Sequence, residues 1–397
     1  MRVLMVTWGW RTHFLPLAPL GWALRAAGHD VRVACQPGQV AAVTEAGLPA
    51  VPVGPPLGFA DVFRGQVGKV ASREAFDTGT DLDGLAPQVT EDGGTLRFAD
   101  VMVDDLITYG RHYRPDLVLY EPFNIAGAIA AAALGVPDVR LLWGPDSTTE
   151  LHLDEDKLIG PRARRAGASG VRITGTLTLD PCPAALQVPV TGPTHPIRFV
   201  PYNGAAILPD WLRHPPDRPR ICLTWGTMMA ELGLTDRISV TTIADALSEL
   251  DAEIVLALAP RHRDTLGPLP ANVRVPTEHL ALHLLLPGCA AVVHQGGAGT
   301  LMTAMACGVP QMVVPAVTDQ HFNGERLTRA GAGTVLADGD EHPAAIRAAL
   351  QRLLTDPGPA AALAVENAAR PTPAAVVPVL EDLAATGRRD FIPGGTP

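Results

Sequence analysis

Short apolar, β-branched runs alternate with segments of helical periodicity along both halves of the sequence. In the first half, an apolar run at 2–8 is followed by a helical segment at 17–29 and a second apolar run at 30–37. Strand, helix and strand in this order form a parallel pair, because the helix carries the chain back to the starting edge of the sheet. The pattern resumes at 115–146. The first half therefore predicts a parallel sheet flanked by helices.

The same alternation restarts after a proline-rich stretch at 202–218. Apolar runs follow at 220–227, 252–260 and 289–297, with helical segments between and after them. A chain of 397 residues with 47% hydrophobic content is long enough for two cores. We therefore expect an α/β fold with two doubly wound, Rossmann-like domains facing a central cleft. The expected boundaries are 1–204 for the first domain, 205–219 for a linker, 220–372 for the second domain, and 373–397 for a terminal helix and tail.

Composition and charge exclude several classes of partner. The net charge is -10, and the 31 Lys and Arg residues are scattered singly, so neither nucleic acid nor an anionic membrane is expected to bind. No apolar run reaches the ~18 residues of a membrane span, and the first ten residues are typical of a strand rather than a signal peptide. The five widely spaced cysteines predict reduced thiols in a cytoplasmic protein and no zinc site.

A glycine turn in the second half is the most informative motif. A strand ends at His294, and Gly296, Gly297 and Gly299 allow a tight turn before Thr300, which we expect to open a helix. The free amides of a helix start, its dipole and a neighbouring imidazole can together offset the charge of a diphosphate without a metal. The alternative is that the glycines serve packing alone, which is the better interpretation of an isolated GGxG.

The longer pattern around this turn resembles a known signature. HQGGAGT at 294–300, GVPQ at 308–311 and DQHFNGERL at 319–327 are similar to the HHGGAGT, GVPQ, D(Q) and NAERL elements of the GT-B nucleotide-sugar glycosyltransferases of natural-product biosynthesis. The resemblance covers nearly the whole chain and is greatest to the macrolide and aromatic-polyketide deoxysugar transferases, including the desosaminyltransferase type. Further similar stretches are AAGHDVRVA (26–34), LLWGPD (141–146), LTLDPCPAALQ (177–187) and RFVPYNG (198–204).

The resemblance implies a TDP-linked deoxysugar donor, a small hydrophobic aglycone as acceptor, and neither a metal nor a separate cofactor. It assigns the acceptor to the first domain, the nucleotide sugar to the second, and the C-terminal helix to a return onto the first. An auxiliary activator protein and a homodimer stay open as partners. The resemblance also implies which residues contact the donor. The sugar hydroxyls would contact Asp319 and Gln320, and the phosphates would contact Gly226 and Thr227 from one side. The diphosphate would be bound by His294, Gly296, Gly297, Ala298, Gly299 and Thr300. His279 and Leu280 stand where the family commonly carries an aromatic-Val-Pro turn beside the nucleotide base.

A histidine is the expected base of an inverting transfer, in which the acceptor hydroxyl loses its proton as it attacks the anomeric carbon. His13 lies in the turn after the first strand, at the sheet edge where doubly wound folds bind ligands, and the resembling family has a matching histidine. A carboxylate usually orients such an imidazole. Glu121, at the end of the strand at 115–122, is the expected partner, and Asp146 is the competing candidate.

Two other functions and a metal site are disfavoured. An NAD(P)-dependent oxidoreductase needs a GxGxxG after the first strand, where this chain has TWGWRTHF. A catalytically weak partner subunit of another glycosyltransferase would not need both His13 and the glycine turn. The acidic patterns at 81–83, 154–156 and 338–340 lie in polar stretches, and we expect solvated loops there rather than metal ligands.

Overall fold

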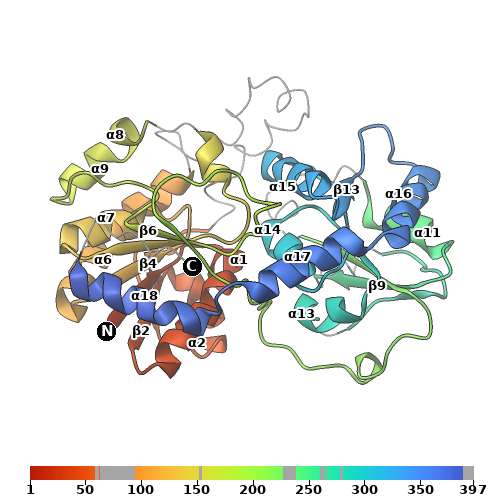
Figure 1. The fold of residues 1–397 in the computed structure, drawn as a ribbon, viewed down its shortest axis with the longest axis horizontal. Helices are drawn as coiled ribbons and strands as arrows, with labels where there is room; N and C mark the ends of the chain where they lie inside the picture. The colour runs from red at the N-terminus through yellow and green to blue at the C-terminus, as the bar shows by residue number, and fades with distance from the viewer. Residues whose placement is uncertain are drawn as a thin grey trace.

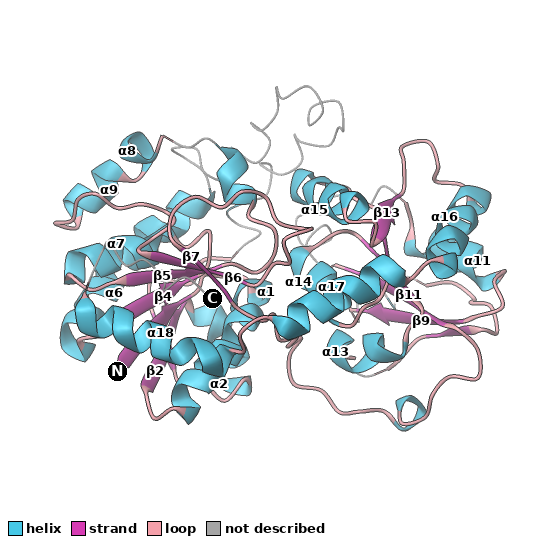
Figure 2. Ribbon diagram, viewed as in Figure 1, coloured by secondary structure: helices cyan, strands magenta, loops and turns pink. Residues whose placement is uncertain are grey.

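The computed structural model describes residues 1–58, 62, 94–151, 154–226, 238–259, 263, 266–277 and 280–387. Two sheets organise these residues, and every strand pair in both sheets is parallel. Figures 1 and 2 show the sheets in two separate bodies, each covered by helices. The predicted α/β class with two parallel sheets is confirmed.

The N-terminal sheet has seven strands in the order β3-β2-β1-β4-β5-β6-β7. Its strands are β1 (Arg2–Val6), β2 (Asp30–Cys35), β3 (Ala50–Pro52), β4 (Leu117–Tyr120), β5 (Asp138–Leu141), β6 (Leu177–Asp180) and β7 (Thr194–Pro196). The α-helices of this part are α1 (Arg11–Phe14), α2 (Ala18–Ala26), α3 (Val40–Glu45), α6 (Gly94–Tyr113), α7 (Ile125–Leu134), α8 (Glu155–Leu158) and α9 (Gly160–Arg165).

Both faces of this sheet are buried, which explains the continuous apolar runs at residues 3–6 of β1 and along β4. Along β1, Leu4 and Val6 join the core under α6 and α7, whereas Val3 and Met5 join the core on the opposite face. Successive side chains of a strand point to opposite faces, so one apolar run supplies both cores. The run that the sequence places at 2–8 is therefore a central strand.

The C-terminal sheet has six strands in the order β10-β9-β8-β11-β12-β13. Its strands are β8 (Arg220–Trp225), β9 (Glu253–Leu258), β10 (Val273–Arg274), β11 (Ala291–His294), β12 (Gln311–Val313) and β13 (Gly333–Val335). The α-helices are α11 (Val240–Ser248), α13 (Leu282–Leu285), α14 (Ala298–Ala306), α15 (Thr318–Arg329), α16 (Pro343–Thr355) and α17 (Gly358–Ala369). Val292 and Val293 again face opposite cores.

The carboxyl edges of the two sheets face each other. Gly144 follows β5, and a Cβ atom added there would lie 3.3 Å from the Cβ of Ala298, at the start of α14. Since α14 follows β11, the loops after strands of one sheet meet those of the other. Ligands of doubly wound sheets bind at this edge, so a site shared by both domains is expected there.

The last helix, α18 (Pro373–Thr386), packs on the N-terminal domain. Val376, Leu380 and Leu383 are buried in the core that contains α2, and Figure 1 shows α18 lying beside α2, far from the sheet that precedes it in the sequence. Thr372 caps its first turn by accepting from the amide of Ala375 at 3.1 Å, and Gly387 ends it in a left-handed conformation with φ of 58°.

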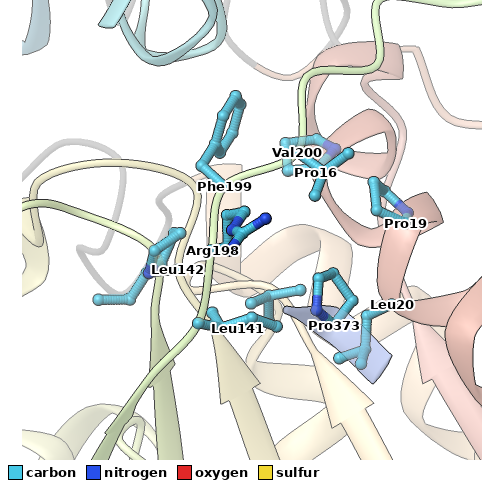
Figure 3. Close-up of a pocket in the computed structure, with 11 residues that line it drawn as sticks. Pro16, Pro19, Leu20, Leu141, Leu142, Arg198, Phe199, Val200 and Pro373 are labelled. Atoms are coloured by element: carbon cyan, nitrogen blue, oxygen red, sulfur yellow. The ribbon is translucent and has the colours of Figure 1, made fainter. Parts of the chain in front are cut away.

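The chain thus crosses between the domains twice, and the two crossings are hydrogen-bonded to each other. The Arg198 amide donates to the Pro371 carbonyl at 2.7 Å. The Asn367 side chain binds both backbone groups of Phe199, accepting from its amide at 2.9 Å and donating to its carbonyl at 3.0 Å. A small pocket beside the crossings (Figure 3) is lined by residues of both, including Phe199, Val200 and Pro373.

The connection at 204–219 is attached to the C-terminal domain. Apart from a short 3-10 helix at Asp210–Leu212 it is irregular, and Figure 1 shows it passing along that domain. The guanidinium groups of Arg220 and Arg274 lie 5.1 and 4.8 Å from the Trp211 ring centroid. Cation-π contacts of this kind fix the segment to the domain that follows it.

Within the part of the chain that the structure describes, no helix combines the length and apolarity that a membrane crossing requires.

Candidate active site

The glycine turn joins β11 to α14. Gly296 has φ of +99°, and a Cβ atom there would lie 2.8 Å from the Gln320 carbonyl oxygen, so only glycine fits. Gly297 is extended and precedes the helix, which begins at Ala298. The expectation that Thr300 opens the helix was wrong by two residues, because the turn is completed at Gly297 and Thr300 lies in the first helical turn.

Packing does not explain the other two glycines of the motif. Among the residues that the structure describes, no atom lies within 4 Å of a Cβ atom added to Gly297 or Gly299. No side chain caps α14, so the amides of its first turn have no side-chain acceptor at the N-cap. The structure therefore leaves an open, amide-lined helix start, which is the geometry that binds phosphate groups.

His294 is buried inside this turn. The Gly296 amide donates to its Nδ1 at 3.0 Å, and its Nε2 lies 2.9 Å from Oε1 of Gln311. Because Nδ1 accepts, the ring proton is placed on Nε2 and donates to Gln311. Burial lowers the pKa of His294 to about 4, so the ring is neutral near pH 7. The structure thus gives His294 a part in shaping the turn as a neutral group, and its contact with a diphosphate stays a prediction.

The loop after β8 is tied to the glycine turn. The Gly226 amide donates to Oε1 of Gln295 at 2.8 Å, which joins the ends of the neighbouring strands β8 and β11. Thr227 and His279 lie outside the described residues. Leu280 is buried in an apolar cluster with Leu285 and Leu286.

Asp319 and Gln320 lie in the first turn of α15. Gln320 is buried, and its Oε1 accepts from the Ala316 amide at 2.8 Å. Burial raises the pKa of Asp319 to about 6, opposed by the backbone amides of Asp319 and Gln320 and by His13.

His13 and Glu121 come together at the edge of the N-terminal sheet. Nδ1 of His13 lies 3.4 Å from Oε2 of Glu121, and this oxygen accepts a hydrogen bond from the Phe123 amide at 3.1 Å. Burial raises the pKa of the fully buried Glu121 carboxyl, and His13, the Phe123 amide and Trp8 oppose that rise. The carboxylate is therefore stabilised mainly by the histidine that it faces.

Asp146, the competing carboxylate, is engaged elsewhere. Its Oδ2 lies 2.7 Å from Nη2 of Arg140, and both side chains are fully buried. Thr148 donates to the same carboxylate through its amide at 3.1 Å. A buried carboxylate paired in this way cannot turn to an imidazole without leaving the arginine unpaired, which is costly. Glu121 is thus the carboxylate that the structure brings to His13.

Aromatic side chains surround His13, a feature that the sequence alone did not reveal. The ring centroid of His13 lies 4.8 Å from that of Trp8 and 4.3 Å from that of Trp143. Phe98 contacts Trp8, and Phe123 contacts Trp143, at 4.5 and 5.7 Å. These rings come from four separate segments, so no local pattern joins them. The tryptophans in the segments TWGW and LLWGPD were the only sign in these motifs of an aromatic cluster around His13.

The acidic pattern at 154–156 has structural partners. Asp154 accepts from the Lys157 amide at 3.1 Å and caps α8, and Asp156 pairs with Arg172 at 2.9 Å. The pattern at 338–340 forms an exposed turn, whereas 81–83 lies outside the described residues. Among the residues that are described, no three His, Cys, Asp or Glu side chains are grouped to hold a metal ion.

Two family models match consecutive parts of the chain. The N-terminal domain of the erythromycin biosynthesis protein CIII-like family matches residues 22–226, and the C-terminal domain of the same family matches residues 241–383. The 10-deoxymethynolide desosaminyltransferase of Streptomyces venezuelae is 38% identical over 98% of each chain. The tylactone mycaminosyltransferase of Streptomyces fradiae is 40% identical, over 98% of this chain and 93% of the relative.

Solved structures agree with these matches. The glycosyltransferase VinC, in complex with dTDP, superposes with a TM-score of 0.81 at 33% identity and covers 97% of this chain and 100% of its own. The spinosyn rhamnosyltransferase SpnG, complexed with spinosyn aglycone, gives 0.82 at 30% identity over 96% of this chain and 100% of its own. The predicted GT-B architecture is confirmed, and these whole-chain matches favour sugar transfer over the oxidoreductase alternative. The chain is therefore a glycosyltransferase and belongs to the erythromycin biosynthesis protein CIII-like family.

Proposed function

We propose that this chain is an inverting transferase that moves a deoxysugar from a TDP-sugar to a hydroxyl of a polyketide aglycone, with His13 as the general base. The observation that carries the proposal is the His13–Glu121 pair, in which Nδ1 of the imidazole lies 3.4 Å from Oε2 of the carboxylate. Relatives named as desosaminyl and mycaminosyl transferases, and solved structures with dTDP or an aglycone, support the donor and acceptor classes.

On the acceptor side, Glu121 holds the proton of His13 on Nδ1. Nε2 is then left to accept the proton of the acceptor hydroxyl as the oxygen attacks the anomeric carbon. The imidazolium that forms is stabilised by the Glu121 carboxylate, whose own charge is favoured by a cationic partner. Attack from the face opposite the diphosphate inverts the anomeric configuration. The half-buried Trp143 beside the imidazole offers apolar surface for a hydrophobic aglycone, and the buried Trp8 supports the imidazole from the core.

On the donor side, the start of α14 receives the diphosphate. The open surface at Gly297 and Gly299 lets phosphate oxygens approach the amides of Ala298 and Thr300, and the helix dipole favours their negative charge. These groups stabilise the departing TDP without a bound cation. Asp319 and Gln320 hold hydroxyls of the sugar, and neutral His294 keeps the turn in shape.

A screen of TDP-deoxysugars against polyketide aglycones tests the proposal. Mass spectrometry detects a glycoside, and the coupling constant of its anomeric proton gives the configuration. An inverted product supports the mechanism, whereas retained configuration refutes it. Turnover measured against enzyme concentration, alone and with a candidate helper protein, decides whether an auxiliary protein or a homodimer takes part. We place the reaction in the cytoplasm, where the five free cysteines would stay reduced.

A further inference from the structure

Three sequence stretches, DQHFNGERL, LTLDPCPAALQ and LLWGPD, meet at one contact between the domains. Arg326 belongs to DQHFNGERL, and its Nε donates to the Leu186 carbonyl at 2.9 Å. Its Nη2 donates to the Gln187 carbonyl at 2.6 Å. Leu186 and Gln187 end LTLDPCPAALQ in the N-terminal domain, so one guanidinium on α15 binds two consecutive carbonyls of the other domain. The planar fork of arginine suits a paired contact of this kind.

Gln187 links this contact to the third stretch, LLWGPD, through hydrogen bonds of its side chain. Its Oε1 accepts from the Asp146 amide at 2.8 Å, and its Nε2 donates to Oδ1 of Asp180 at 2.8 Å. The Asp146 carboxylate is itself fixed by Arg140 at 2.7 Å. The loop that contains Asp146 is therefore held from two directions, by a buried arginine and by Gln187.

The same loop touches both halves of the proposed active site. Trp143 contacts the His13 ring at a centroid distance of 4.3 Å. The neighbouring Gly144 lies against α14, since a Cβ atom there would come within 3.3 Å of the Cβ of Ala298 and 3.6 Å of Met302. A shift of this loop would therefore move Trp143, which packs on His13, relative to the proposed diphosphate site at the start of α14.

Helix α15 connects this contact to the sugar and to the glycine turn. Asp319, Asn323 and Arg326 are spaced i, i+4 and i+7, which places them on one face of the helix. Nδ2 of Asn323 donates to the Gly296 carbonyl at 2.8 Å. One rigid face thus presents Asp319 toward the sugar, secures the turn around the diphosphate and reaches the N-terminal domain.

We propose that Arg326 is a positioning residue for sugar transfer. Its contact with Leu186 and Gln187 sets α15, and with it the anomeric carbon, at the reacting distance from His13. This inference builds on the proposed role of His13 as the base. Reactions between groups held by separate domains depend steeply on alignment, and a displacement of about 1 Å can cost on the order of a hundredfold in rate. Donor contacts within the C-terminal domain do not involve Arg326, so its loss should affect turnover more than donor affinity.

The test compares Arg326→Ala and Arg326→Lys with Arg329→Ala as a matched control. Arg329 lies on the same helix, and its ion pair with Glu325 stays within that helix. We expect Arg326→Ala to lower kcat by roughly ten- to a hundredfold. TDP affinity by calorimetry should stay within about twofold, because the phosphates contact the C-terminal domain alone. Lysine should recover part of kcat through one retained hydrogen bond, and Arg329→Ala should behave as the parent enzyme.

A double-mutant cycle with Gln187→Ala tests the route through which Arg326 acts. If both residues hold the loop at Asp146, their effects on kcat should be clearly less than additive, whereas Arg329→Ala and Gln187→Ala should add. A normal kcat in Arg326→Ala would overturn the positioning role. It would also be overturned if both Arg326 variants lost TDP affinity and melting temperature together with kcat, because that pattern indicates a general structural defect. His13→Ala measured in parallel separates the two proposals. Normal turnover there refutes the base, whereas an inactive His13→Ala beside a fully active Arg326→Ala refutes the positioning role alone.

Discussion

His13 and Glu121 reach their 3.4 Å contact from neighbouring parallel strands, because β1 pairs with β4 in a register that sets Val6 opposite Tyr120. Glu121 is the next residue after Tyr120, so it leaves the sheet beside Thr7, and His13 returns to it from the short helix α1. The pair is thus fixed by the central ladder of the domain. A base held by the sheet itself keeps its orientation while the domains move.

Replacing His13 by alanine should lower kcat by a factor on the order of a hundred to ten thousand, the usual contribution of a positioned base. TDP affinity should be nearly unchanged, because the proposed diphosphate site lies on the other domain. Steady-state kinetics and calorimetry measure the two effects, with His214→Ala, at an exposed histidine, as control. The loss should shrink for a phenolic acceptor, which ionises more easily. Near-normal turnover on an alcohol acceptor would contradict the assignment.

Chelation should leave the enzyme fully active. The start of α14 offers backbone amides and a helix dipole to the diphosphate, and these need no cation. Initial rates in excess EDTA, compared with rates in added magnesium or manganese, make the measurement. Activity that disappears with EDTA and returns with either metal would show that a cation stabilises the leaving group.

Donor binding should weaken as the pH falls through about 6. Burial raises the pKa of Asp319 to about 6, so the carboxylate that we propose as the acceptor of sugar hydroxyls is present above that pH and protonated below it. Calorimetric titration of a TDP-sugar between pH 5 and 8 should show the affinity falling toward the acid end. Asp319→Asn should bind more weakly and with little pH dependence, and Asp382→Asn on α18 should follow the parent. A parent affinity that is flat between pH 5 and 7 would rule out this role.

His294 should make folding stability sensitive to acid. Its pKa is lowered from 6.5 to about 4 in the folded protein, so between these values the unfolded chain binds a proton that the folded chain does not. The stabilisation is complete above 6.5 and is lost as the pH falls toward 4, and it amounts to roughly 3 kcal/mol. Urea denaturation across this range should show a shallower pH dependence in His294→Gln than in the parent. Parallel curves for the two proteins would contradict the prediction.

Local patterns predicted the elements that position the site, because strand and helix periodicity are properties of short segments. The run at 2–8, His13 after it and Glu121 after β4 all follow from this periodicity and from the rule that ligands bind at the carboxyl edge of a parallel sheet. The resemblance of HQGGAGT to the glycosyltransferase signature predicted the part of the site that binds the donor. The open helix start at Gly297 and Gly299 agrees with a ligand-binding turn rather than with packing alone.

Features that depend on distant partners were not predictable. His294 looked like a charge partner for a diphosphate, but Gln311 on the adjacent strand and the amide of Gly296 take both of its ring nitrogens. Asp146 was the competing candidate to Glu121, but its carboxylate is paired with Arg140. In each case burial and a hydrogen bond from another strand decide the protonation or the pairing, and neither is visible in a short stretch of sequence.

The paired crossings at Phe199 and Asn367 limit how the two domains can move. A single flexible linker would let them separate, tilt and twist, but the proline-rich stretch at 202–218 is attached to the domain that follows it. Trp211 holds that stretch against the C-terminal domain, so flexing is confined to the crossings. Two chain segments bonded side by side resist stretching and shearing together, which leaves rotation about a common axis as the soft motion. The angle between the two domains would then control both the entry of an acceptor and the departure of TDP. Rotation about the crossings alone would set how far the space between the domains opens.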